Sequence, residues 1–143
     1  MVLQCIALFA SILFAGAAIY VSAVEQPARL KLADGPMLQQ WKDSYDRASV
    51  MQAALAMVAA LLGLWIGWRD GSAAWTIGGV LMLASWPWTF AVMMPGNRKL
   101  KATSPDNVTP ETRALVAQWG RFHLMRLALG TAGSLVYLSQ FCR

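Results

Sequence analysis

The chain has 143 residues, of which 57% are hydrophobic and only 13% are charged. Average soluble domains carry roughly 45–50% apolar and about 25% charged residues, so this composition excludes a disordered chain and a charge-rich coiled coil. Long charge-free stretches cover residues 1–24, 48–68 and 71–97. Because about 20 apolar residues span the hydrocarbon core of a bilayer, the sequence predicts an integral membrane protein.

The elements expected along the chain are all helical. The first transmembrane helix is predicted at about residues 3–24. Apolar residues at helical spacing beside charged ones then predict a short amphipathic helix over about residues 36–46, lying at the cytoplasmic interface. The second and third transmembrane helices are expected at about residues 48–68 and 73–94, joined by a tight turn at residues 69–72.

A fourth transmembrane helix is expected at about residues 114–142, although its hydropathy is weaker. It contains Arg121, His123 and Arg126. Its start signal is good, because residues 109–111 place a threonine cap, a first-turn proline and a first-turn acid in order. The sequence therefore predicts one all-α membrane domain over the whole chain, a four-transmembrane-helix bundle with the interfacial helix between its first two members.

The basic residues favour one orientation in the membrane. One side is expected to carry only Arg69 and Arg143, whereas the two longer loops on the other side hold Arg29, Lys31, Lys42, Arg47, Arg98, Lys99, Lys101 and Arg113. The positive-inside rule then places both long loops in the cytoplasm and both termini in the periplasm. The net charge of +5 fits contact with anionic membrane lipid. We expect no nucleic-acid partner, because no soluble module carries a basic face.

The fourth helix carries the residues most suggestive of chemistry. At about 100° per residue, Trp119, His123, Arg126 and Gly130 fall on one narrow face, and Arg121 falls on the opposite one. An ionisable residue inside a membrane costs at least a few kcal/mol unless it is paired or hydrated. Two interpretations remain open: this face lines a functional cavity, or its polar residues form a structural pair that locks the bundle.

The other helices bring polar groups to the same cytoplasmic end. Glu25 closes the first helix, Arg47 opens the second, and Asn97 follows the third. We therefore expect these three residues, with His123 and Arg126, to form one hydrogen-bonded neighbourhood. If binding alone were the function, Arg126 would pair permanently with Glu25 and leave no cavity.

The third helix is interrupted by Pro87, which stands between Trp86 and Trp88. Proline removes a backbone hydrogen bond and kinks a helix, and in a membrane such a break is tolerated inside protein or beside a cavity. The flanking indoles would give flat walls for an aromatic ligand. Ordinary helix packing is the alternative interpretation.

These residues also form a set of motifs. The motifs are Glu25–Arg29 after the first helix, Gln40–Lys42 with Tyr45 and Arg47, Trp86–Pro87 with Thr89, Met94–Pro95 with Asn97 and Leu100, and Trp119 with His123 and Arg126. Together they resemble a small family of four-span membrane proteins, largely of unknown function, that includes the fungal anthrone oxygenases. The bacterial members are the most similar, which implies an inner-membrane location. Many relatives have histidine where this chain has Gln26, and an amide cannot relay a proton.

The resemblance implies an oxygenase that needs no cofactor and acts on a lipophilic phenolic, anthrone-type or quinol-type compound. A base would remove a benzylic proton, and the electron-rich anion would react directly with dioxygen. The roles implied are His123 as base, Arg126 as oxyanion partner, Glu25 as orienting group, Tyr20, Trp88 and Trp119 as stacking partners, and Arg47 and Asn97 as further substrate-binding residues.

Two classes of function therefore remain. The first is the oxygenase or a related redox enzyme. The second is a non-catalytic membrane protein that binds a lipid or quinone, or that supports a partner protein. No metal site is expected, because His123 is the only histidine and zinc sites need several His or Cys ligands. A ring-sized pocket that touches His123 would favour the enzyme.

Overall fold

A computed structural model describes residues 1–142, in which all regular secondary structure is helical. The elements in chain order are α1 Val2–Tyr20, the π-helical segment η1 Val21–Glu25, α2 Gln26–Arg29, α3 Asp34–Asp70, α4 Ala73–Trp88, the π-helical segment η2 Thr89–Met93, α5 Met94–Ala102, the short turn η3 Pro105–Asn107, and α6 Pro110–Leu138.

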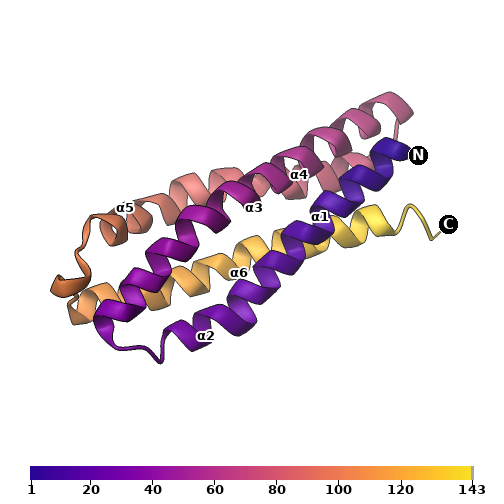
Figure 1. The fold of residues 1–143 in the computed structure, drawn as a ribbon. Coiled ribbons are helices and arrows are strands. Elements are labelled where there is room, and N and C mark those ends of the chain that lie inside the picture. Colours follow the sequence, from indigo (N-terminus) through magenta and orange to yellow (C-terminus); the bar gives the residue numbers. More distant parts are fainter. Residues whose placement is uncertain (143) are drawn as a thin grey trace.

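The long helices lie side by side and enclose a shared core (Figure 1). Contacts run from α1 to α3, from α3 to α4, from α4 to α6, and from α6 back to α1. Both chain termini lie at one end of the molecule, and the α2–α3 and α5–α6 connections lie at the other (Figure 1). The helices therefore form a closed ring in which each long helix has two neighbours.

Three helical segments are long and apolar enough to cross a membrane: Val2–Arg29, Asp34–Asp70 and Ala73–Ala102. The predictions of an all-helical fold and of a membrane-embedded protein are confirmed at this level. Within the described residues, α6 does not meet the same measure of length and hydropathy. It carries Arg121, His123 and Arg126 near its middle.

The prediction of a separate interfacial helix over residues 36–46 is wrong. The structure has instead one 37-residue helix, α3, from Asp34 to Asp70. The helix is continuous because no glycine or proline interrupts the chain between Met37 and Leu62. The apolar face expected to lie on the membrane surface is fully buried inside the protein, as Trp41 shows with 0% exposure.

The helix ends follow local sequence signals. Gly71 ends α3 in the left-handed conformation at φ 65°, which glycine adopts without steric strain, so the turn at residues 69–72 is as predicted. Thr109 caps α6 and exchanges hydrogen bonds with Thr112 in a capping box, which confirms the predicted start. The third helical segment extends beyond the predicted residue 94 to Ala102, and α6 ends at Leu138 rather than at 142.

Two buried clusters divide the interior. The terminal-end core is made of Ala7, Ala10, Phe14, Ala56, Ala59, Ala60, Ile66, Trp75, Met82 and Tyr137. The loop-end core is made of Val21, Met37, Leu38, Trp41, Met93, Leu100, Val116 and Trp119. The buried polar residues Arg29, Asn97, His123 and Arg126 lie in the half of the molecule that contains or borders the loop-end core.

Candidate functional site

Two π-helical segments shape the polar half of the bundle, and each ends two residues before a proline. In η1 the backbone N–H of Gln26 bonds to the carbonyl of Val21, five residues back, and Pro27 follows at once. In η2 the N–H of Met94 closes the same kind of turn before Pro95. Proline has no N–H to continue the α-helical pattern, and single π turns occur frequently at functional sites.

Each π segment presents one hydroxyl group to α6. Ser22 Oγ on η1 lies 3.1 Å from His123 Nδ1. Thr89 on η2 donates its hydroxyl proton to the carbonyl of Ser85 at 2.7 Å, and its oxygen accepts a hydrogen bond from Arg126 Nη1 at 3.3 Å. The wide turns therefore orient His123 and Arg126 from two sides.

Arg126 is a buried cation that has only neutral partners. Arg126 is 8% exposed. Besides its bond to Thr89, it donates from Nη2 to Gln52 Oε1 at 3.2 Å. Its guanidinium carbon also lies 5.5 Å from the ring centroid of Phe14, a cation–π contact. Within residues 1–142 no carboxylate forms an ion pair with Arg126. The positive charge is thus available to an anionic group of a ligand.

His123 is held flat against Trp119. The two ring centroids are 5.1 Å apart with 27° between the planes, and His123 is only 3% exposed. Ser22 contacts Nδ1, whereas Nε2 has no hydrogen-bond partner within the described part of the chain. One ring nitrogen is therefore positioned by the protein and the other is free to exchange a proton.

A second polar cluster is connected to the Trp119–His123 stack through Trp119. Glu25 and Arg29 form a 2.6 Å ion pair, with side chains 14% and 1% exposed. Gln40 donates to Glu25 at 2.9 Å and accepts from Arg29, while Arg29 also donates to Gln26 at 2.6 Å. The guanidinium carbon of Arg29 lies 5.5 Å from the ring centroid of Trp119. Trp119 thus contacts both Arg29 and His123.

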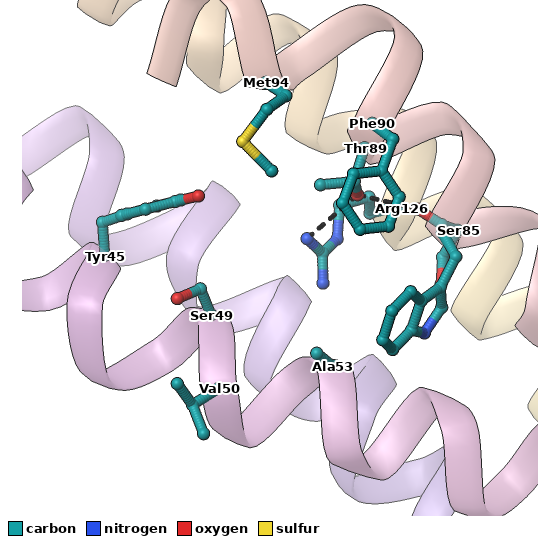
Figure 2. A pocket seen from close by; sticks show the side chains of 10 residues that line it. Tyr45, Ser49, Val50, Ala53, Ser85, Thr89, Phe90, Met94 and Arg126 are labelled. Atoms are coloured by element: carbon teal, nitrogen blue, oxygen red, sulfur yellow. Dashed lines mark hydrogen bonds between the residues drawn. The ribbon is translucent and has the colours of Figure 1, made fainter. Parts of the chain in front are cut away.

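An outer cavity of about 260 Å³ lies between α3 and the α4–η2 segment, and Arg126 reaches it from α6 (Figure 2). Its lining residues are Tyr45, Ser49, Val50, Ala53, Ser85, Trp86, Thr89, Phe90, Met94 and Arg126. Val50 and Phe90, at its rim, are 71% and 56% exposed. On a membrane helix such apolar residues face lipid, so the mouth of this cavity opens on the lipid-facing surface.

An inner cavity of about 20 Å³ adjoins the outer one. It is lined by Val21, Ser44, Tyr45, Ala48, Ser49, Gln52, Met93, Asn97, Trp119, His123 and Arg126. Tyr45, Ser49 and Arg126 line both cavities and therefore form the boundary between them. Asn97 donates from Nδ2 to the Tyr45 hydroxyl at 3.1 Å.

The structure brings part of the predicted site together. Asn97, Trp119, His123 and Arg126 all line the inner cavity. Glu25 pairs with Arg29 instead of Arg126, so the permanent Glu25–Arg126 pair expected if binding alone were the function is not formed.

Four predicted residues line neither cavity, and Glu25, in its pair with Arg29, is one of them. Tyr20 is 57% exposed, because it ends α1 on the outward face just before η1. Arg47 is an exposed charged residue that borders a shallow surface depression. Trp88 turns toward α6 and donates to the backbone oxygen of Phe122 at 3.1 Å, while its neighbour Trp86 lines the outer cavity. The expected single hydrogen-bonded neighbourhood is therefore not formed: among residues 1–142, neither Glu25 nor Arg47 hydrogen-bonds to Asn97, His123 or Arg126.

Some residues of the site gave little or no signal in the sequence. Gln52 is the one amide side chain in the charge-free stretch 48–68. An isolated amide in an apolar helix could have marked it as a site residue, but the helical periodicity gave no such indication. Arg29 and Gln40 belong to the motifs given above, but no signal indicated that Arg29 is buried beside Trp119 and bonded to Gln40. Ser22 gave no signal, because serine is common in membrane helices.

The family model described as anthrone oxygenase matches residues 41–136, more than half of the chain. The chain belongs to the anthrone oxygenase family. The match includes Gln52, Thr89, Asn97, His123 and Arg126, whereas Ser22 and the Glu25–Arg29 pair precede it. Searches of curated proteins and of solved structures gave no match.

Proposed function

We propose that this member of the anthrone oxygenase family is a membrane-embedded oxygenase that acts, without a cofactor, on a lipophilic phenolic, anthrone-type or quinol-type compound. One observation carries the proposal: the guanidinium of Arg126 is buried, bonded only to neutral groups, and reaches an apolar cavity. A buried charge without a counter-ion is costly, and an oxyanion formed on the substrate would provide that counter-ion.

The chemistry needs a base, a cation and a dry aromatic slot. The substrate rings occupy the outer cavity beside Trp86 and Phe90, with the substrate oxygen at Arg126. Removal of a proton from the methylene carbon leaves an anion whose charge is shared with that oxygen. Dioxygen then adds to the carbon, and the peroxide anion takes the proton back from the protonated base. The resulting hydroperoxide loses water to give the carbonyl, so that CH₂ and O₂ become C=O and H₂O. His123 is the base of this scheme.

The outer cavity suits a substrate that reaches it from the bilayer. Its volume of about 260 Å³ is close to the lower end of small-molecule sites, roughly 300 Å³. Its rim residues Val50 and Phe90 are apolar and exposed. A lipophilic ring compound dissolved in the membrane would pass between them without crossing water.

The proposed topology makes α6 the fourth transmembrane helix, in the inner membrane of a bacterium. α6 packs against α1 and α4, and the two termini lie at the same end of the molecule (Figure 1). The distribution of basic residues then puts both termini in the periplasm. Reporter fusions at Asp70 and Asp106 test this orientation: Asp70 should report the periplasm and Asp106 the cytoplasm. The same compartment for both sites, or the reverse pattern, would contradict it.

Oxygen uptake by the purified protein with anthrone as substrate tests the activity. Arg126→Ala should lower turnover strongly, and Arg126→Lys should lower it less, because lysine keeps the charge but loses the planar donor fork. Arg121→Ala is the matched control, since Arg121 is an exposed arginine on the same helix. Turnover that disappears with a chelator would show that a metal is required. Absence of turnover on any anthrone or quinol would favour the non-catalytic binding protein.

A further inference from the structure

The two cavities separate the proposed substrate from the proposed base. The outer cavity is large enough for rings but is not lined by His123, whereas the inner cavity is lined by His123 but measures only about 20 Å³. A ring system cannot enter the inner cavity. His123 must therefore act on a substrate in the outer cavity through something small that occupies the inner one.

The inner cavity also gathers polar atoms that have no protein partner. Within residues 1–142, five buried side-chain atoms have no hydrogen-bond partner, and three of them belong to residues that line this cavity: Asn97 Oδ1, Trp119 Nε1 and Arg126 Nε. The other two are Trp41 Nε1 and Trp86 Nε1. The three lining residues are at least nine-tenths buried, with exposures of 2%, 8% and 8%. Native proteins leave few buried polar atoms unpaired, so three around one small space point to a polar ligand. Among the described residues, His123 Nε2 is the fourth atom at this cavity without a partner.

These four atoms match the hydrogen-bonding capacity of one water molecule. Trp119 Nε1 and Arg126 Nε can only donate, and Asn97 Oδ1 can only accept. If His123 Nδ1 carries the ring proton and donates it to Ser22 Oγ, then Nε2 is an acceptor. A water molecule accepts two hydrogen bonds and donates two, and it needs about 10–15 Å³ of such a cavity.

We propose that the inner cavity binds a single water molecule that relays the substrate proton to His123. The water accepts from Trp119 and Arg126 and donates to Asn97 and His123. When the substrate fills the outer cavity, Arg126, which lines both cavities, turns its donors to the substrate oxygen and frees one lone pair of the water. That lone pair takes the substrate proton while the water passes one of its own protons to His123 Nε2, so the water itself is unchanged. The relay role rests on the proposed function, whereas the water site does not.

Two alanines on α3 allow the inner and outer cavities to be filled separately. Ala48 lines only the inner cavity and Ala53 only the outer one, and both are half-buried. Ala48→Val should displace the water while leaving the four polar side chains and the substrate cavity in place. Ala53→Val makes the same change of volume on the same helix, but beside the substrate.

The water site is tested by structure determination of the whole protein in lipid nanodiscs at a resolution that shows ordered water. The wild type should show one water within about 3.2 Å of at least three of the four atoms, and Ala48→Val should lack it. A wild-type inner cavity without water density, or one closed by rearranged side chains, would overturn the site.

The relay is tested by oxygen uptake with anthrone. Ala48→Val should lower kcat at least tenfold with little change in KM, and Ala53→Val should mainly raise KM. The wild-type rate should be lower in D₂O than in H₂O, because the proton that reaches His123 comes from the water, whereas direct transfer from the substrate carbon to His123 would give little such solvent effect. Full kcat in an Ala48→Val variant that has lost the water would overturn the relay, even though the wild type binds the water. A wild type that shows the water but no turnover would contradict the proposed function alone.

Discussion

The terminal-end core and the loop-end core are built from the same helices but differ in how tightly they are packed and in how many buried polar atoms lack a partner. In the first, a Cβ atom on Gly63 would lie 1.7 Å from the Tyr137 hydroxyl, and that hydroxyl donates to the Ala59 carbonyl at 2.8 Å. Among residues 1–142, four of the five buried side-chain atoms without a partner lie in or beside the loop-end core, namely Trp41 Nε1, Asn97 Oδ1, Trp119 Nε1 and Arg126 Nε. The fifth, Trp86 Nε1, belongs to a residue packed against the terminal-end core. Polar groups left unpaired in this way are characteristic of sites organised for a ligand.

Helix α6 takes part in both regions. Toward its C-terminus, Tyr137 stacks on Trp75 with ring centroids 4.7 Å apart, and Gly133 packs against Met82. Near its middle, the same helix carries His123 and Arg126, which line cavities. The comparison indicates that the tightly packed half holds α6 at a fixed depth, so that its polar face meets Ser22 and Thr89 on the π segments.

The largest effect is expected from removal of the base. His123→Ala should reduce oxygen-dependent turnover of anthrone by about 10²–10⁴, the usual contribution of a positioned base, while the protein stays folded because the terminal-end core is untouched. Oxygen uptake and thermal unfolding measure the two effects. Met125→Ala, a substitution at a 42% exposed position on the same helix, is the control and should keep full activity. Full activity in His123→Ala would remove the base assignment.

Loss of the Glu25 charge should be the next largest effect. Glu25→Gln leaves the guanidinium of Arg29, 1% exposed, without its carboxylate, and breaking such a buried pair costs about 3–5 kcal/mol of stability. Asp70→Asn breaks the Arg69–Asp70 pair, whose side chains are 43% and 37% exposed, and should leave stability unchanged. Denaturant or thermal unfolding in detergent compares them. Equal stability of the two variants would mean that the Glu25–Arg29 pair is fully solvated.

A glycine substitution tests the tight packing of the terminal-end core. Gly63→Ala should destabilise the protein by about 1–3 kcal/mol, because the new methyl group forces Tyr137 away from the Ala59 carbonyl. Gly16→Ala is the matched control, since a Cβ there meets nothing within 4 Å and alanine favours the helix. Thermal unfolding of both variants measures the difference. A stable Gly63→Ala would show that this half of the bundle is looser than its contacts indicate.

Much of the fold was predictable because membrane helices leave strong signals in composition. The charge-free stretches located the apolar segments, and Thr109 with Pro110 located the start of α6. The continuity of α3 was not predictable from periodicity, because its polar N-terminal half resembles an interfacial helix until its partners are known. An apolar residue such as Trp41 fits a membrane surface as well as a protein core, and it is a core residue here because α5 and α6 pack around it.

The candidate site was predictable only along a single helix. The shared face of Trp119, His123 and Arg126 follows from helical geometry, and the structure brings all three to one cavity. Which residues meet that face from other helices depends on rotations that sequence does not encode locally. The π turns before Pro27 and Pro95 shift those rotations, so Ser22 and Thr89 point inward.

The smallest effect expected concerns the hydroxyl that contacts His123. Ser22→Ala removes the contact to Nδ1 at 3.1 Å without changing the Trp119 stack, so the imidazole keeps its plane but loses the group that fixes its tautomer. One hydrogen bond contributes about 0.5–1.5 kcal/mol, which corresponds to a roughly two- to tenfold loss of kcat. Ser22→Thr, which keeps the hydroxyl, should recover most of the rate, and Ser11→Ala is the control, because Ser11 bonds only to the Leu8 carbonyl of its own helix. A Ser22→Ala enzyme as fast as wild type would show that the Trp119 stack alone positions the base.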